Sequence, residues 1–261
     1  MDVIRASIST GTPVCGAWVS LGNTQSIEVM GKSGYDFLIL DTQHGGITFD
    51  QVLPALQVLG SATPALVRVP WRDPAQIMRA ADLGAAGVIV PMISTAEEAA
   101  QAVAAIRYPP AGIRSFGPVR SYYTVSAEPV EPLCFVMVET AEAMHNLDAI
   151  AATPGLDGIF VGPVDLALSL GCGAAMKMPP QVLDAMDKVV LCCEKYGIIA
   201  GCASLGMDNA EDLLRRGVRL VAIGSDFAFL RNAAAGNAAL GKTLTSRYTR
   251  TPNNTEPVRK G

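Results

Sequence analysis

Several side chains suited to acid–base or metal chemistry follow short apolar runs of this sequence. Asp41 and His44 come after YDFLIL, Glu139 comes after CFVMV, and Asp165 comes shortly after GIFVG. Carboxylates such as Glu139 and Asp165, together with waters and substrate oxygens, suit Mg²⁺ or Mn²⁺ better than zinc or calcium. The neutral imidazole of His44 is a natural general base near pH 7. These residue types indicate metal-assisted acid–base chemistry.

Arg68 lies inside the apolar run ALVRVP, where a guanidinium needs an anionic partner. That partner is either a substrate carboxylate or enolate, or a structural acid such as Asp41 or Glu139. The other residues have structural alternatives too. Asp165 could cap a helix at LALSL, and His44 could be structural.

The elements that must position these residues repeat in one order, an apolar run followed by a helical pattern. The apolar runs are continuous, as in strands buried on both faces. They cover residues 16–21, 35–41, 65–70, 87–92, 134–139, 158–162, 198–203 and 220–225. Helices are predicted over residues 24–34, 49–61, 73–84, 95–110, 141–153, 181–197 and 207–217. The pattern predicts an α/β fold, a (β/α)8 TIM barrel, and the alternative is a doubly wound open sheet.

Two helix starts carry specific signals. Asp73 followed by Pro74 is typical of a cap and a first-turn proline. Thr95 and Glu98 fit a capping box. Pro54 is expected in the first turn of its helix.

In a TIM barrel the active site lies at the carboxyl ends of the strands. The barrel therefore gathers the acids, Arg68 and His44 around one mouth. The region from Ile106 to Pro132 is expected to form a long loop over that mouth. Residues 1–244 are predicted to form one barrel domain, and residues 245–261 a flexible tail.

Composition limits the class of protein. The 261 residues carry 20 Lys and Arg against 24 Asp and Glu, a net charge of −4, which disfavours nucleic-acid binding. Mean hydropathy is +0.31, yet no apolar run reaches the roughly 18 residues of a membrane span. The six cysteines form no CxxC pair and the amino-terminal stretch has no apolar signal region. A cytoplasmic location is therefore expected.

The sequence resembles the HpcH/HpaI family of class II, metal-dependent pyruvate aldolases, of the 4-hydroxy-2-oxoheptanedioate or 2-dehydro-3-deoxyglucarate aldolase type. The resemblance covers roughly residues 12 to 240. It rests on YDFLILDTQHG, RVPWRDP, LGAAGVIVPMI, RYPPAGIRSFGP, VETAEAMHNLDAI and LDGIFVGPVDLALSLG. It implies a carbon–carbon lyase that cleaves a 4-hydroxy-2-oxo acid to pyruvate and an aldehyde by retro-aldol chemistry.

The resemblance also implies roles for individual residues. His44 matches the family's catalytic base, and Asp82 matches the acid that raises the basicity of that histidine. Arg68 matches the arginine that stabilises the enolate, and Asp41 matches the aspartate at the end of the preceding strand. Glu139 and Asp165 match the metal ligands. Substrate contacts are implied for Arg68, Met137, Gly162, Pro163, Val164 and Asp165.

Two positions depart from the family pattern. Gln43 replaces a glutamate, which removes a negative charge near the mouth, and Met137 replaces a glutamine that contacts substrate. These changes keep two alternatives open. One is an oxaloacetate decarboxylase or enolate-trapping enzyme of the same family, and the other is a non-catalytic barrel that binds an oxo acid.

The expected cofactor is Mg²⁺ or Mn²⁺, with Co²⁺ as an alternative, and no organic cofactor is expected. The expected partners are a small 2-oxo acid and an aldehyde, with no nucleic acid and no membrane. The resemblance implies a homo-oligomer, commonly a hexamer, in which a carboxyl-terminal helix packs on a neighbouring subunit. Residues 230–244 fit such a helix.

Overall fold

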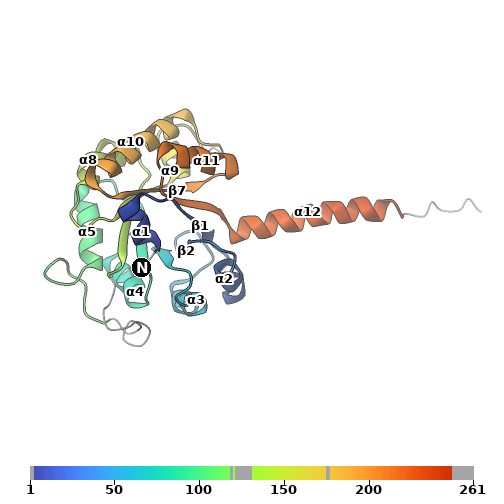
Figure 1. The fold of residues 1–261 in the computed structure, drawn as a ribbon, viewed down its shortest axis with the longest axis horizontal. Coiled ribbons are helices and arrows are strands. Elements are labelled where there is room, and N and C mark those ends of the chain that lie inside the picture. The colour runs from blue at the N-terminus through green and yellow to red at the C-terminus, as the bar shows by residue number, and fades with distance from the viewer. Residues whose placement is uncertain (1–2, 118–119, 121–130, 175–176, 249–261) are drawn as a thin grey trace, which may run out of the picture. The chain divides into compact units, whose positions relative to one another are not determined.

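The computed structural model describes residues 3–117, 120, 131–174 and 177–248. These residues divide into two compact units, one ending at Asp226 and one beginning at Phe227. The first unit contains eight parallel strands that close into a barrel in chain order, as the sequence predicts. Helices surround the sheet (Figure 1). The strands are β1 (Val14–Val19), β2 (Phe37–Asp41), β3 (Ala65–Arg68), β4 (Gly87–Val90), β5 (Leu133–Val138), β6 (Gly158–Val161), β7 (Ile199–Ser204) and β8 (Leu220–Ser225).

Most helices fall where the sequence predicts them, with ends that differ by a few residues. They are α1 (Val3–Thr10), α2 (Thr24–Gly31), α3 (Val52–Leu59), α4 (Pro74–Asp82), α5 (Ala96–Ile106), α7 (Ala141–His145), α8 (Leu147–Ala151), α9 (Pro163–Ser169), α10 (Pro180–Tyr196), α11 (Met207–Arg216) and α12 (Asp226–Ser246), with a 3₁₀ turn η1 (Phe49–Gln51) before α3. The predicted helix over 230–244 lies inside α12. Of the predicted tail, residues 249–261 lie outside the described residues. None of the described helices has both the length and the apolar character needed to cross a membrane.

The capping signals explain several helix starts. Asp73 accepts a hydrogen bond from the Ala75 amide at 3.0 Å, with Pro74 in the first turn of α4. Thr95 accepts one from the Glu98 amide at 3.2 Å. The capping box is incomplete, because the Glu98 carboxylate accepts from the Ser94 amide at 2.8 Å rather than from that of Thr95. Pro54 lies in the first turn of α3, as predicted.

Two helices were not predicted from the sequence. In addition, one segment predicted as a single helix forms two helices. Helix α1 precedes the first strand, and the short helix α9 follows Gly162. The predicted helix over 141–153 breaks at Asn146 because the side-chain amide of this residue donates to the Ser94 carbonyl at 2.8 Å. A hydrogen bond to a residue so distant in the chain leaves no periodic signal in the sequence.

Alternate residues of each strand point into the barrel and fill it. The inner layer contains large side chains from several strands, including Phe37, Ile39, Phe135, Met137 and Phe160. Glycines make room for the rings: a Cβ at Gly16 would lie 2.4 Å from the Phe37 ring, and one at Gly158 would lie 2.4 Å from Phe135. The barrel is therefore a packed core that closes one end of the site.

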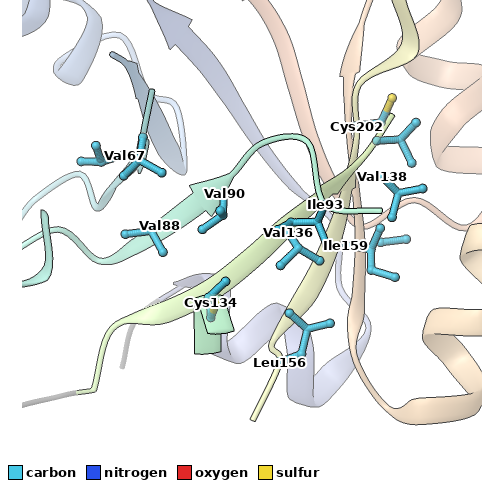
Figure 2. Close-up of a cluster of buried hydrophobic side chains, with 14 of the residues drawn as sticks. Val67, Val88, Val90, Ile93, Cys134, Val136, Val138, Leu156, Ile159 and Cys202 are labelled. Carbon is cyan, nitrogen blue, oxygen red and sulfur yellow. The ribbon is translucent and has the colours of Figure 1, made fainter. Parts of the chain in front are cut away.

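The other residues of each strand point outward and pack beneath the helices. Figure 2 shows part of this layer, in which Val88 and Val90 of β4 have Cys134 and Val136 of β5 as register partners. Because both faces of every strand are covered, the strands are apolar without interruption until the polar residues at their carboxyl ends.

The prediction that the connection over 106–132 lies over the mouth is wrong for its described residues. Helix α5 runs antiparallel to the strands, so the chain leaves it at the amino-terminal end of the barrel and enters β5 there. The Arg107 guanidinium donates to the Pro132 carbonyl, and Arg114 pairs with Asp82 at the end of α4. The described residues of this connection, which include most of GIRSFGP, therefore lie opposite the mouth. Residues 118–119 and 121–130 lie outside the described residues.

Candidate active site

Asp41 and Arg68 end neighbouring strands and form a buried pair. Their Cα atoms are register partners in β2 and β3, and they continue the inward-facing series of Ile39 and Leu66. Arg68 Nε donates to Asp41 Oδ1 at 2.9 Å and Nη2 donates to Oδ2 at 2.7 Å. The relative exposures are only 4% for Asp41 and 8% for Arg68. Arg68 therefore forms the structural ion pair with Asp41 that the sequence left open, and the pair is bidentate.

This pair leaves part of the guanidinium available. Arg68 Nη1 makes no hydrogen bond with any described residue, since the two bonds to Asp41 use Nε and Nη2. The guanidinium also lies over the Trp18 ring, 4.4 Å from its centroid, and Trp18 contacts the Phe160 ring edge-on at 5.8 Å. The aromatic floor holds the cation on one side. A bound anion can reach the free nitrogen without breaking the pair.

Glu139 directly follows β5 and is 2% exposed. Its Oε1 accepts a hydrogen bond from the Met92 amide at 2.7 Å. Burial raises the pKa of the Glu139 carboxyl and the Asp165 carboxylate raises it further, while the Met92 hydrogen bond and the Arg68 charge oppose the rise. The charges of Arg68 and Asp165 therefore act on the Glu139 carboxyl in opposite directions.

Asp165 is placed by the turn from β6 into α9. Gly162 caps α9 and Pro163 starts it, so Asp165 lies in the first turn and is not the helix cap that its sequence position allowed. Its side chain is exposed, and Val164 beside it is partly exposed. A Cβ at Gly162 would lie 2.3 Å from Oε2 of Glu139, so any other residue here would have to displace this carboxylate. The turn thus brings the second carboxylate close to the first.

The two carboxylates are the residues that could hold a metal. Among the described residues, no three His, Cys, Asp or Glu side chains gather closely enough to form a complete metal site. The protein would therefore supply two oxygen ligands and leave the remaining positions to water and substrate. Mg²⁺ is commonly bound in that way, through one or two carboxylates.

His44 lies on the loop that follows Asp41. Its backbone amide and that of Gln43 both donate to Asp41 Oδ1, at 3.2 and 3.1 Å. The residue is exposed, and its imidazole makes no hydrogen bond within the described part of the chain. The Oε1 atom of Gln43 is buried and has no described partner. A glutamate in the same unpartnered position would cost more to bury, because its charge would also lose hydration.

Within one chain, Asp82 does not lie with the site residues at the mouth of the barrel. It is the last residue of α4, at the amino-terminal end of the barrel. Arg114 donates to Asp82 Oδ1 through Nη2 at 2.7 Å and through Nε at 3.2 Å. The Arg114 guanidinium also lies over the Tyr108 ring, 4.5 Å from its centroid. A helix that runs antiparallel to the strands carries its last residue away from the mouth, so Asp82 and His44 of the same chain lie at opposite ends.

Three residues near the mouth were not predicted from the sequence as part of the site. Trp18 lies beneath Arg68 and Phe160 beneath Trp18, and the period-two alternation of β1 and β6 could have indicated both. Met92 holds Glu139 through a backbone amide, for which the sequence carries no signal. Met137 is 2% exposed and points into the barrel two residues before Glu139. It could therefore contact a ligand at the mouth only from the barrel interior.

A parallel barrel with two carboxylates and an arginine at the carboxyl ends of its strands has the form of a carbon–carbon lyase site that stabilises an enolate. The model of the HpcH/HpaI aldolase/citrate lyase family matches residues 15–233. The chain belongs to this family, and it is an enzyme of the aldolase and lyase type.

Individual relatives cover nearly the whole chain. The 5-keto-4-deoxy-D-glucarate aldolase of Klebsiella pneumoniae is 38% identical over 240 residues, 88% of this chain and 92% of the relative. The crystal structure of a family protein from Burkholderia cenocepacia matches with a TM-score of 0.83 and 30% identity over 94% of this chain and 100% of that one. The structure of citrate synthase SbnG matches with a TM-score of 0.82 and 26% identity over 93% and 98%.

Proposed function

We propose that the protein is a divalent-metal-dependent aldolase that cleaves a 4-hydroxy-2-oxo acid into pyruvate and an aldehyde. The observation that carries the proposal is that Arg68, Glu139 and Asp165 lie at the carboxyl ends of β3, β5 and β6, with the Gly162 turn that carries Asp165 packed against Oε2 of Glu139. The similarity to a relative named 5-keto-4-deoxy-D-glucarate aldolase makes that sugar acid the first substrate to test.

The residues present fit a divalent metal. Asp165 raises the cost of ionising the buried Glu139 carboxyl, and the Arg68 cation that opposes this effect already pairs with Asp41. A second positive charge between the carboxylates would offset this repulsion. We propose Mg²⁺ or Mn²⁺, since two carboxylates form a hard oxygen donor set. When bound, such a metal would supply Lewis-acid polarisation of the 2-oxo group.

The chain's own residues then account for the proton and the charge. His44 accepts the proton of the C4 hydroxyl as the C3–C4 bond breaks, and the bonding electrons pass into the pyruvate enolate while the aldehyde leaves. Arg68 stabilises the negative charge through its free nitrogen. Protonation at C3 gives pyruvate. The backbone amide of Val164, in the turn formed by Gly162 and Pro163, orients the carboxylate end, and the Trp18 and Met137 side chains exclude water from below.

The test measures pyruvate release from a panel of 4-hydroxy-2-oxo acids with Mg²⁺, with Mn²⁺ and with a strong chelator. We expect cleavage to require metal, to be lost in Asp165→Ala, and to fall by about 10²–10⁴-fold in His44→Ala if His44 is the base. Because His44 is exposed, the variant should keep the thermal stability of the parent. Full activity with the chelator would refute the metal assignment.

A second candidate reaction is decarboxylation of oxaloacetate, followed by trapping of the same enolate. Met137 keeps it open, because this buried thioether cannot supply the polar substrate contact that a glutamine would make at this position. Metal-dependent loss of CO₂ from oxaloacetate without aldehyde formation would select this reaction. Failure with every substrate would leave a barrel that binds an oxo acid without turnover.

We further propose a homo-oligomer, and a hexamer is expected from the family. If Asp82 raises the basicity of His44, the two residues must come from different subunits, because one chain holds them at opposite ends. Ile113 and Phe116, next to the arginine that pairs with Asp82, are 62% and 70% exposed, which suits a contact surface. We propose that α12 packs on a neighbouring subunit. Mixing inactive Asp82→Asn and His44→Ala proteins should restore part of the activity, and sedimentation would give the number of subunits.

A cytoplasmic location stays a prediction. All six cysteines are free, and this fits a reducing compartment. Fractionation of cells that express the tagged protein would test it.

A further inference from the structure

Met92 has a backbone conformation that its side chain does not favour. It lies just after β4 with φ of 56°, and no other described residue except glycine has a positive φ. Such a conformation costs free energy for a residue with a Cβ and persists only where the surroundings enforce it. Strained residues of this kind concentrate at functional sites, and Met92 touches one.

The strained residue presents its amide to Glu139. Met92 N donates to Glu139 Oε1 at 2.7 Å. The other carboxylate oxygen, Oε2, lies against Gly162, where a Cβ would come within 2.3 Å. One oxygen of Glu139 is therefore fixed by a hydrogen bond, and the other faces the turn that carries Asp165.

A polar clamp holds Met92 from the outside. Arg72 Nη1 donates to the Met92 carbonyl at 3.4 Å, and Arg72 Nη2 pairs with Glu98 Oε1 at 3.1 Å. The second oxygen of Glu98 accepts from the Ser94 amide at 2.8 Å. The Glu98 carboxylate, in the first turn of α5, thus holds both Arg72, which contacts the Met92 carbonyl, and Ser94, which follows Met92 by two residues.

The segment after Met92 is also fixed by β5 and by the two residues that cap α7. Ile93 N donates to the Met137 carbonyl at 3.3 Å. The Ser94 carbonyl accepts from Asn146 Nδ2 at 2.8 Å, and the Ser94 hydroxyl bonds that of Thr140 at 2.8 Å. Residues 93 and 94, which follow the strained residue, are thus bonded to partners on other elements. The surroundings therefore over-determine the conformation of Met92.

We propose that the left-handed backbone at Met92, held by Arg72 and Glu98, is a positioning device that fixes Oε1 of Glu139 and leaves Oε2 for the metal. Arg72, Glu98 and Met92 are positioning residues, because they act through Glu139. The inference rests on the proposed metal dependence of the enzyme. It follows that metal affinity depends on residues of the β3–α4 and β4–α5 connections that touch no ligand.

The experiment measures binding of Mn²⁺ alone to the full-length protein by the electron paramagnetic resonance signal of free Mn²⁺. Loss of a residue that orients a metal ligand typically weakens metal binding by about 10–100-fold. We expect a loss in this range for Arg72→Ala, with cleavage restored at saturating Mn²⁺. We also expect Met92→Gly to bind Mn²⁺ more tightly than Met92→Val, because glycine adopts a positive φ freely and a β-branched residue does not.

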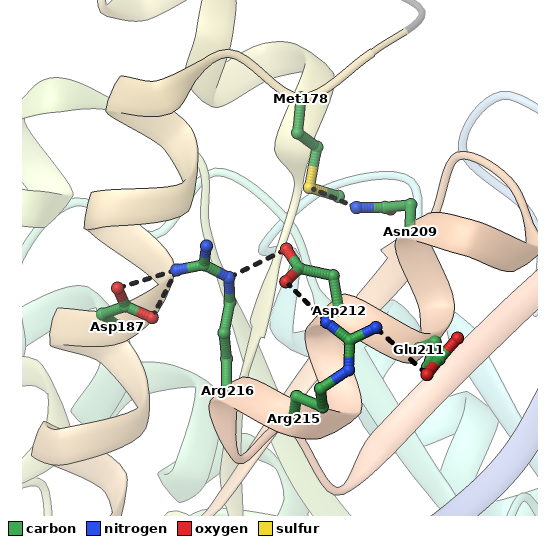
Figure 3. A network of polar contacts seen from close by, with 7 residues as sticks. All are labelled: Met178, Asp187, Asn209, Glu211, Asp212, Arg215 and Arg216. Carbon is green, nitrogen blue, oxygen red and sulfur yellow. Dashed lines mark hydrogen bonds and ion pairs between the residues drawn. The ribbon is translucent and has the colours of Figure 1, made fainter.

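A matched control removes a similar arginine elsewhere. Arg216, at the end of α11, pairs with Asp187 at 2.8 Å and with Asp212 at 2.9 Å (Figure 3). Arg216→Ala should lower thermal stability and leave Mn²⁺ affinity at the parent value. Glu139→Gln should abolish binding.

The outcomes separate the two proposals. If the parent protein does not bind Mn²⁺, or Glu139→Gln binds as the parent does, the proposed metal site itself fails. If the parent binds and Glu139→Gln does not, but Arg72→Ala binds as tightly as Arg216→Ala, the positioning device is refuted. Equal affinities for Met92→Gly and Met92→Val would refute it too, since the backbone conformation would then be irrelevant.

Discussion

Gly162 offers a direct test of how tightly the site is built. In Gly162→Ala the new methyl group would start 2.3 Å from Glu139 Oε2, whereas Cβ contacts in proteins essentially never fall below 3.0 Å. The carboxylate must therefore retreat by at least 0.7 Å, the difference between these distances. It cannot swing freely, because Oε1 is held by the Met92 amide and the residue is 2% exposed.

The expected effect follows from that displacement. A misplacement of about 1 Å in a catalytic site can lower the rate by about 10²-fold, and overpacking a buried position costs about 1–3 kcal/mol of stability. We expect Gly162→Ala to lose pyruvate formation and Mn²⁺ affinity on this scale. Pyruvate release would be followed continuously across Mn²⁺ concentrations, and unfolding by urea would give the stability.

The control for Gly162→Ala is Gly16→Ala. Its Cβ would start 2.4 Å from the Phe37 ring, deeper in the barrel, so it should lower stability to a similar degree and leave Mn²⁺ affinity intact. Parent-like turnover and Mn²⁺ affinity in Gly162→Ala would show that Glu139 can move without consequence. The close contact of Gly162 with Glu139 would then have no role in metal binding or catalysis.

Three further predictions concern buried groups. Arg68→Ala leaves the Asp41 carboxylate buried without its partner, so we expect a loss of about 3–5 kcal/mol in urea unfolding; a loss below about 1 kcal/mol would contradict the buried pair. Burial raises the pKa of the Glu139 carboxyl above its ordinary value of 4.5. In the metal-free protein, the protonated carboxyl therefore contributes its full share of the free energy of unfolding at acid pH, and this share is lost as the pH rises through the raised pKa. Metal-free Glu139→Gln should then be more stable than the parent at neutral pH but not near pH 4, and equal stabilities at both pH values would refute the shift. Burial raises the pKa of the Cys134 thiol to about 12, so iodoacetamide at pH 8 should label it only after unfolding, as peptide mass spectrometry can show; rapid labelling of the native protein would contradict its burial.

The sequence alone was enough to predict the barrel. Strands covered on both faces must be apolar without interruption, and helices that cover a sheet on one side must be amphipathic, so the alternation of the two patterns is visible in one dimension. The same pattern showed that Asp41 and Glu139 end strands, and it placed Arg68 inside its strand, where the structure has it as the last residue. Since parallel strands end at the same side of a barrel, the convergence of these three residues follows from the order of the elements along the chain.

Other features were decided only by the tertiary structure. The bidentate pairing of Arg68 with Asp41, rather than with Glu139, depends on the register of β2 against β3. The strained backbone of Met92 depends on partners from several other elements, and no residue type announces it. The described residues of the 106–132 connection lie at the end of the barrel opposite to the predicted one, because composition marks a segment as irregular but does not say at which end of the barrel it lies.

Asp82 shows most clearly what could not be predicted from the sequence. Local sequence identifies it as an acid at the end of a helix, and resemblance assigns it to His44. Only the path of α4, antiparallel to the strands, shows that one chain holds these residues at opposite ends. Periodicity along the chain reports which face of an element is buried, because burial acts on each residue locally. Which distant groups meet depends on the closure of the barrel and the order of its strands, and these exist only in three dimensions.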